Sequence, residues 1–499
     1  MIRSFAADGL KRFASIRCFS STPDFTKNNY NVQRGGYQSL EEDHIKYFQT
    51  LLGENRLVMD LSDLEQYNVD WFKHYRGNSK LVLKPKTTEE VSKILSYCNK
   101  NKLAVCPQGG NTGVVGGQVP VFDEIIISMA LMNQIESVDE HLGVLVCQSG
   151  CILENLDNEL EKKGFMMPLD LGAKGSCHIG GNVSTNAGGL RLLRYGNMHG
   201  NVLGLEAVKA NGEIIDLMSS LKKDNTGFHL KHLFIGSEGT LGVVTKVAIQ
   251  CAVRPKSINL AFLGLQSFPK VLKTFMQAKQ DLGEILSAME VMDSATMDFV
   301  KDKLKVESPI GEYPFYLVIE TSGSNDEHDA DKLHKFLETT LIKHFALNGT
   351  VATEPSKVKE MWQIRERIPD SFVKDDYVFL YDVTLPIPDY FTLVDDVRDH
   401  LGSKGKVFGF GHLGDGNLHI QVAVDKYTHE IKDFIEDYMY SRVVELKGSI
   451  SAEHGIGFAK IKYLEKIKDK NALIFMRQMK RLMDPNGILN PYKLIFEQH

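Results

Sequence analysis

The sequence predicts an α+β protein of two or three domains, and three observations support this. The chain has 499 residues, which is more than one domain usually holds. Short apolar runs alternate with helical patterns from about residue 81 to 253. The stretch from about 256 to 440 combines both patterns again, and we expect it to form a mixed sheet with helices on one face. Its helical patterns fall at 268–282 and 389–401, and its strand patterns at 315–320 and 377–385.

The composition excludes several classes of protein. Hydrophobic residues make up 43% of the chain and charged residues 24%, as in ordinary globular proteins. A net charge of −6 argues against nucleic-acid binding as the main activity. No apolar run approaches the ~18 residues that a transmembrane helix needs. The seven cysteines are scattered and lack CxxC spacing, so we expect free thiols and an intracellular location.

The first 22 residues differ from the rest of the chain. They carry Arg3, Lys11, Arg12 and Arg17 against one acidic residue, Asp8, with serines and small residues between them. A basic, serine-rich segment that can form an amphipathic helix is typical of a mitochondrial transit peptide. A disordered tail is the alternative. We therefore leave residues 1–22 out of the fold.

The first elements lead to a glycine-rich loop. Residues 81–83 read as a strand, and Thr87 with two following glutamates is typical of the start of a helix, which we expect to end near Asn101. A second strand at 103–107 runs into residues 108–117, where five of ten residues are glycine. Such a loop exposes backbone N–H groups and can hold a pyrophosphate. It matches neither the GxGxxG nor the GxxxxGK[ST] pattern, and alone it can be only a turn.

Two further glycine-rich segments strengthen this interpretation. The first is 180–189, preceded by PLDLG at 168–172, and the second is 236–244, which leads into an apolar strand. Side chains at these positions would hold the main chain away from a ligand. Three such loops beside strands therefore favour a large dinucleotide lying along the backbone.

A different motif predicts a metal site. His412 and His419 flank a glycine-rich turn between two apolar runs, which is typical of a hairpin. Glu453, in SAEHG at 451–455, adds a carboxylate. Two nitrogens and one oxygen leave the fourth position of a zinc ion open, as catalysis requires, and His454 can then move a proton. The alternative is a tight turn with two structural histidines.

Together these motifs resemble a known family. PxGGNTG, GGNxSTNAGG, GSEGTLGVVT, GHLGDGNLH, SAEHGIG and DPNGILNP occur in this order. The chain is similar, from about residue 45 to its end, to the FAD-linked 2-hydroxyacid dehydrogenases of the vanillyl-alcohol-oxidase flavoprotein superfamily. The resemblance implies a two-part FAD-binding domain at 45–255, a substrate or cap domain at 256–440, and a C-terminal segment at 441–499 that packs back on the flavin domain.

The resemblance also implies which residues contact bound but unlinked FAD. Some relatives attach the flavin through a histidine in the first loop, where this chain has Asn111. The positions that match flavin-contacting residues are Pro107, Gly109, Gly110, Asn111, Thr112, Gly113, Pro168, Gly180, Gly181, Ser184, Thr185, Asn186, Gly188, Gly189, Gly242, Val244 and Asn490.

The substrate residues match the family only in part. Arg365 matches a carboxylate-binding arginine, although from the sequence alone it would read as a surface residue. The branch that oxidises D-2-hydroxyglutarate usually has Thr, Lys and Asn where this chain has Pro369, Leu380 and Gln421. Either Lys374 or Arg367 supplies the missing charge, or the site prefers a smaller or less charged 2-hydroxy acid.

The resemblance implies a reaction as well. Arg365, with Gln421, would bind the substrate, zinc on His412, His419 and Glu453 would bind its hydroxyl, and His454 would remove the proton. The hydride would pass to flavin N5, and the electrons to an electron-transfer flavoprotein in the mitochondrial matrix. The D-lactate dehydrogenases, which use cytochrome c, are the close alternative. A zinc hydrolase and a non-catalytic flavin-binding subunit stay open as other classes.

Overall fold

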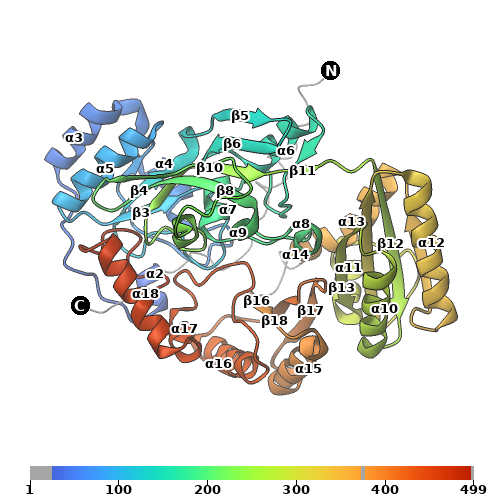
Figure 1. Ribbon diagram of the computed structural model, residues 1–499. Coiled ribbons are helices and arrows are strands. Elements are labelled where there is room, and N and C mark those ends of the chain that lie inside the picture. The colour runs from blue at the N-terminus through green and yellow to red at the C-terminus, as the bar shows by residue number, and fades with distance from the viewer. Residues whose placement is uncertain (1–24, 372–376, 496–499) are drawn as a thin grey trace. The chain divides into compact units, whose positions relative to one another are not determined.

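The computed structural model describes residues 25–371 and 377–495 (Figure 1). The predicted transit peptide and Lys374 lie outside the described residues. The chain divides into two compact units. Unit A consists of Pro23–Arg254 together with Ser451–His499, and unit B is Pro255–Ile450. Among the described residues, no helix combines the length and the apolar character needed to cross a bilayer.

Unit A begins with a four-stranded sheet in the order β1-β2-β4-β3. Its strands are β1 (Leu57–Val58), β2 (Val82–Leu83), β4 (Ile125–Ser128) and β3 (Val105–Gln108). Helices α3 (Glu42–Leu52) and α5 (Thr88–Lys100) share an apolar core with these strands. The predicted start of α5 is confirmed, because the Thr87 side chain accepts a hydrogen bond from the backbone N–H of Glu90.

The second sheet of unit A has five antiparallel strands in the order β5-β6-β10-β8-β9. They are β5 (Ile135–Asp139), β6 (Val144–Gln148), β10 (Val243–Gln250), β8 (Val202–Val208) and β9 (Ile214–Leu217). Helices α6 (Leu153–Glu161) and α7 (Ile179–Ser184) pack against it through Leu156, Leu160 and Val183. The strand β10 follows the third glycine-rich segment, as the sequence predicts.

The C-terminal segment packs on the first sheet of unit A. It contains α17 (Ile461–Ile467) and α18 (Lys470–Met483). Beyond α18, Leu489 forms a parallel bridge with Val105 of β3. The backbone N–H of Val105 donates to the carbonyl of Ile488, and that of Asn490 donates to the carbonyl of Val105. This confirms that the C-terminal segment returns to the domain that carries the glycine-rich loops. The returning segment starts after Ile450.

Unit B is built on a seven-stranded sheet in the order β15-β12-β14-β13-β17-β18-β16. The strands are β12 (Ser257–Leu265), β13 (Leu286–Asp293), β14 (Phe315–Gly323), β15 (Asn348–Ala352), β16 (Tyr377–Thr384), β17 (Lys406–His412) and β18 (Asn417–Val424). The helices are α10 (Phe268–Asp281), α11 (Ser294–Leu304), α12 (Asp326–Ile342), α13 (Pro355–Glu366), α14 (Ile368–Ser371), α15 (Tyr390–Leu401) and α16 (His429–Glu445).

Two details of the predicted sheet are wrong, although the α+β class is confirmed. Every pair of neighbouring strands is antiparallel, because β14 inserts between β12 and β13, the two strands that α10 joins. This is the arrangement of a split β-α-β unit. Helices also pack on both faces. A side chain at Gly409 would meet Val394 of α15, whereas α13 contacts the opposite face through Arg365.

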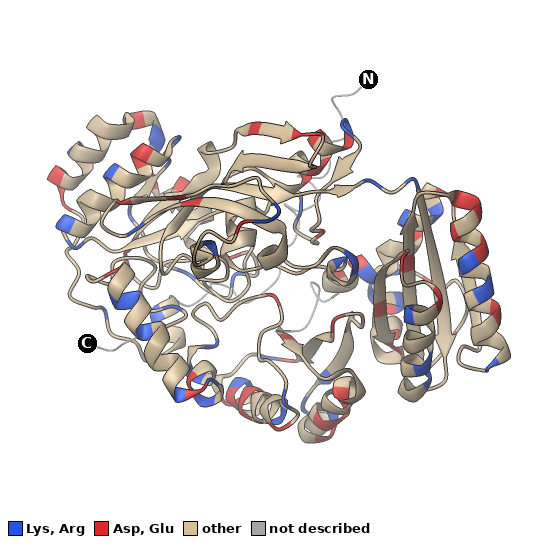
Figure 2. Cartoon of the chain, in the orientation of Figure 1, with Lys and Arg blue, Asp and Glu red and all other residues tan. Residues whose placement is uncertain are grey.

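Charge in unit B follows the helices rather than the strands. Figure 2 shows acidic and basic residues concentrated on α12, α15 and α16, with few on the strands of the sheet. An acidic residue buried inside a strand is therefore exceptional here. Glu290, Glu320 and Asp382 are three such residues, each at most 1% exposed.

Candidate functional site

The three glycine-rich segments of unit A line one cavity of about 310 Å³. A cavity of this size is at the lower end of the range of ligand pockets. Twelve residues predicted to contact a dinucleotide line it, namely Pro107, Gly109, Gly110, Asn111, Thr112, Gly113, Gly180, Gly181, Ser184, Thr185, Gly242 and Val244. Pro168, Asn186, Gly188, Gly189 and Asn490 were predicted with them and are not among its lining residues.

Close backbone contacts shape the first loop. A Cβ at Gly110 would lie 2.0 Å from the carbonyl oxygen of Ser176, so only glycine fits there. Asn111 adopts a φ of +55°, and its Nδ2 donates to the carbonyls of Gln66 and Val69. The loop is therefore held open between two neighbouring segments, and its backbone lies against the cavity.

Several polar atoms at this cavity are buried and have no hydrogen-bond partner among the described residues. They are Asn111 Oδ1, Ser149 Oγ, His178 Nδ1 and Asn182 Oδ1. Burial lowers the pKa of His178, which favours its neutral form. Buried polar groups normally have partners, so a polar ligand fits this cavity well. Ser149, His178 and Asn182 were not predicted as ligand contacts, although the last two lie in the segment CHIGGN at 177–182.

Glu453 and His454 line the same cavity. Glu453 Oε2 accepts a hydrogen bond of 2.7 Å from the backbone N–H of Gly189, in the second glycine-rich segment. Glu238 fixes the turn that follows, because its two carboxylate oxygens accept from the backbone N–H groups of Ile456 and Gly457. Burial raises the pKa of Glu238.

Asn490 secures the loop from outside the cavity. Its Nδ2 donates to the carbonyls of Gly117 and Glu238, at 2.9 and 2.8 Å. The buried Lys493 donates to Asn490 Oδ1 and to the carbonyl of Gly117. Asn490 therefore joins the end of the first glycine-rich segment to the third one.

The predicted hairpin of unit B is confirmed. Strands β17 and β18 pair directly, with His412 opposite Asn417 and Phe410 opposite His419. The Nε2 atoms of His412 and His419 lie 3.3 Å apart. A tetrahedral zinc ion with Zn–N bonds of 2.0–2.1 Å would separate two ligand nitrogens by about 3.3–3.4 Å. The histidine pair thus has the spacing of two ligands of one metal ion.

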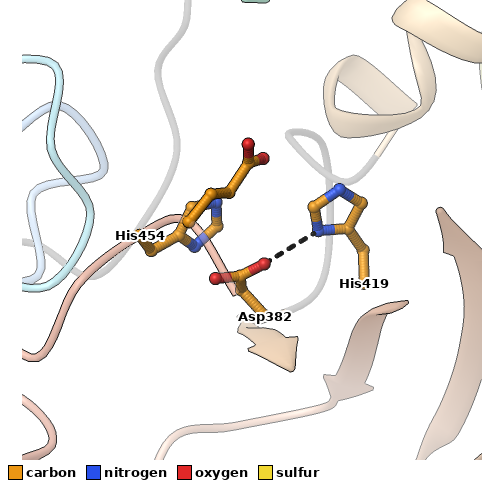
Figure 3. A group of neighbouring side chains, drawn as sticks. Asp382, His419 and His454 are labelled. Carbon is orange, nitrogen blue, oxygen red and sulfur yellow. Dashed lines mark ion pairs between the residues drawn. The ribbon is translucent and has the colours of Figure 1, made fainter. Parts of the chain in front are cut away.

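A buried carboxylate lies on the Nδ1 side of each histidine. His412 Nδ1 donates to Glu290 Oε1 at 2.6 Å. His419 Nδ1 lies 3.7 Å from Asp382 Oδ1, the ion pair drawn in Figure 3. Carboxylates in this position orient histidine ligands so that Nε2 faces the metal. Glu290 and Asp382 were not predicted as site residues; each is an acidic residue within an apolar strand, and that was the signal the sequence offered.

The charges around Glu290 are balanced. Burial alone would raise the pKa of Glu290, but His412 and Arg365 outweigh it, and the pKa is lowered. Glu290 thus holds its negative charge inside the sheet.

Arg365 lies on the same face of the sheet. Its Nε donates to Glu290 Oε2 at 2.8 Å, and its guanidinium carbon lies 4.7 Å from the ring centroid of Phe410. Neither Nη nitrogen has a hydrogen-bond partner within the described ranges. A guanidinium that is held at Nε and open at both Nη nitrogens suits a carboxylate ligand.

Farther along β18, the site becomes less charged. Gln421 is 5% exposed, and its Oε1 has no partner in the described part of the chain. Its cross-strand neighbours are Leu380 and Phe408. Pro369 lies in the short helix α14. Arg367, one candidate for the missing cation, is half-exposed and pairs with Asp370.

The residues predicted to bind the metal, to bind the substrate and to transfer the proton are divided between the units. His412, His419, Arg365 and Gln421 belong to unit B, and Glu453 and His454 belong to unit A. Each unit thus carries part of the predicted set.

Comparisons with known proteins find a matching family for each of two long segments of the chain. Residues 79–218 match the FAD binding domain, and residues 254–494 match the C-terminal domain of FAD linked oxidases. The 4-ethylphenol oxidase of Gulosibacter chungangensis shares the fold. Its TM-score is 0.73 at 16% identity, over 94% of this chain and 99% of that one. The two domain matches thus define an FAD-linked oxidoreductase, and its fold is shared with the 4-ethylphenol oxidase.

Sequence relatives narrow the class to a family. The mitochondrial D-2-hydroxyglutarate dehydrogenase of Danio rerio is 52% identical over 460 residues, covering 92% of this chain and 86% of the relative. A putative mitochondrial D-lactate dehydrogenase of Schizosaccharomyces pombe is 45% identical, covering 96% and 95%. The chain belongs to the family of FAD-linked D-2-hydroxyacid dehydrogenases that includes these proteins.

Proposed function

We propose that this protein oxidises D-2-hydroxyglutarate to 2-oxoglutarate with FAD and zinc. The proposal rests mainly on the arrangement of side chains on one face of the sheet in unit B. This arrangement places two histidine Nε2 atoms 3.3 Å apart on the same face as an arginine whose two Nη nitrogens have no hydrogen-bond partner in the described part of the chain. A metal and a carboxylate are the ligands that this face suits. The relatives named D-2-hydroxyglutarate dehydrogenases support the choice of substrate.

The cavity of unit A would hold the FAD without a covalent bond. Its glycines allow close approach of the backbone, and its unpaired polar atoms offer hydrogen bonds. The proposed contacts are those that the family resemblance implies. Asn490 would act by securing the loop. When bound, FAD supplies the acceptor for the hydride.

His412, His419 and Glu453 would hold the zinc, with Glu453 assigned from the SAEHG motif and the family resemblance. When bound, zinc supplies a Lewis acid that lowers the pKa of a hydroxyl group. Arg365 would bind the carboxylate next to that hydroxyl, and its guanidinium lies over the ring of Phe410. His454 would accept the hydroxyl proton.

D-lactate is the second candidate substrate, and Leu380 is the observation that favours it. Leu380 stands opposite the buried Gln421, where a cation would be needed for a second carboxylate. A buried carboxylate without partners costs several kcal/mol. The amide of Gln421 could donate one hydrogen bond to such a group, which leaves D-2-hydroxyglutarate as the first choice.

The location and the electron acceptor belong to the proposal too. Relatives from animals and plants are named mitochondrial, and residues 1–22 suit a transit peptide. We propose the mitochondrial matrix, with an electron-transfer flavoprotein as the acceptor.

A substrate panel tests the function. The purified full chain should show the flavin absorbance bands and reduce an acceptor dye with D-2-hydroxyglutarate, more slowly with D-malate. A higher kcat/KM for D-lactate would select the second candidate. A flavin spectrum without turnover on any of the three acids would leave a non-catalytic flavin protein, and absence of flavin would favour a zinc hydrolase.

The role of His454 has its own test. Replacing it by alanine should keep the flavin spectrum and lower kcat by at least two orders of magnitude, within the ~10²–10⁴ range of general bases. Turnover close to that of the unchanged chain would remove His454 from the reaction.

A further inference from the structure

We infer that Glu290 is a positioning residue that couples the proposed metal ligand His412 to the proposed substrate ligand Arg365. The inference rests on the proposed function, since it gives one buried carboxylate a part in both binding events. Neither the family motifs nor the sequence pattern singled out Glu290.

The two oxygens of Glu290 have separate tasks. Oε1 accepts from His412 Nδ1 at 2.6 Å, and Oε2 accepts from Arg365 Nε at 2.8 Å. Glu290 on β13 is the cross-strand neighbour of His412 on β17, whereas Arg365 comes from helix α13. One side chain that is 1% exposed thus joins two strands and a helix.

These contacts decide which atoms face a ligand. Glu290 accepts a hydrogen bond from His412 Nδ1, so His412 keeps its proton on Nδ1. Its Nε2 atom, which lies 3.3 Å from Nε2 of His419, then presents a lone pair. Glu290 also accepts a hydrogen bond from Arg365 Nε. The two Nη nitrogens of Arg365 are then left to bind a ligand. A neutral amide at position 290 could not accept from both partners in this way, because it has one oxygen.

Glu320 is a second buried glutamate that contacts α13, but it does not couple His412 to Arg365. It lies on β14, next to β13, and is also 1% exposed. Its oxygens accept from Trp362 Nε1 on α13 at 2.9 Å and from Ser287 Oγ at 2.7 Å. Glu320 therefore anchors the same helix through a different residue, and no hydrogen bond joins it to His412 or Arg365 within the described residues. It provides a matched control.

The test compares Glu290→Gln with Glu320→Gln in the full chain loaded with FAD. Zinc affinity is measured by competition with a chromophoric chelator, and KM and kcat are measured with D-2-hydroxyglutarate. Glu290→Gln should weaken zinc binding ~10–100-fold, as loss of a carboxylate behind a histidine ligand typically does, and raise KM by at least about tenfold. Glu320→Gln should leave both values within about twofold, and both variants should keep the flavin spectrum.

Equal zinc affinity and KM in Glu290→Gln and the unchanged chain would overturn the inference, and so would equal losses in the two variants. If Glu290→Gln does not fold, Glu290→Asp takes its place; the shorter carboxylate should keep the charge but not both contacts, with losses in the same direction. Failure of both to fold, with Glu320→Gln folded, would assign Glu290 a purely structural role. An unchanged chain that binds no zinc and turns over no substrate would instead refute the proposed function.

Discussion

At the scale of single residues, the candidate site depends on how buried charges are paired. Glu290, Arg365 and His412 form one hydrogen-bonded chain on a face of the sheet, and each has a partner that offsets the cost of burial. The two Nη nitrogens of Arg365 have no hydrogen-bond partner among the described residues. A substrate carboxylate at that position would complete the set.

Arg365 offers a direct test at this scale. Arg365→Lys should raise KM at least about tenfold, because a lysine cannot form the two-pronged bond to a carboxylate or stack on Phe410 as a planar group. The flavin spectrum should not change. The matched control is Arg442→Lys, at a partly exposed position of α16 paired with Asp396 and Glu445, which should leave KM unaltered. Equal KM values for the two variants would contradict the role of Arg365.

The buried carboxyl group of Asp70 should make the free energy of unfolding depend on pH. It is 2% exposed, and burial raises the pKa of its carboxyl to about 7, although it accepts from the backbone N–H of Tyr75. In the unfolded chain this pKa is about 3.9. Because the folded value is higher, the stability that this group contributes is complete below about pH 4 and is lost as the pH rises through about 7.

Asp70→Asn removes this titration. Between pH 6 and pH 8, the free energy of unfolding of the unchanged chain should fall by about 1.4 kcal/mol relative to the variant. Urea unfolding of both proteins at the two pH values measures the difference. If the free energies of unfolding of the two proteins differ by the same amount at pH 6 and pH 8, Asp70 does not titrate in this range.

At the scale of elements, the glycine-rich loops determine the cofactor cavity. Gly110 has the closest approach in the first loop, 2.0 Å from its virtual Cβ to the carbonyl of Ser176. Gly110→Ala should therefore lower the free energy of unfolding by about 1–3 kcal/mol and reduce the FAD content of the purified protein. The control is Gly200→Ala, because a Cβ there meets nothing within 4 Å. Full FAD content in Gly110→Ala would show that the loop can shift without loss.

Local patterns predicted these elements well, and long-range pairing explains what they missed. Thr87 caps α5 and the 413–416 turn joins β17 to β18, because both signals act within a few residues. Glu290 is 122 residues from His412, so no local pattern could connect them. The insertion of β14 between β12 and β13 was missed for the same reason, because strand order depends on non-local pairing.

At the scale of the whole molecule, the proposed chemistry needs contributions from both units. Unit A carries the proposed FAD cavity with Glu453 and His454, and unit B carries the histidine pair and Arg365. The sequence motif and the family resemblance assign Glu453 to the same metal as His412 and His419. The account therefore predicts that loss of the metal stops the reaction without releasing the flavin.

Anaerobic reduction of the bound flavin by D-2-hydroxyglutarate, followed in a stopped-flow spectrometer, tests this claim most directly. The chain as purified should lose its flavin absorbance rapidly on mixing. After treatment with a chelator it should keep its flavin but lose the reaction, and added zinc should restore it. Equally fast bleaching in the metal-free chain would contradict the account.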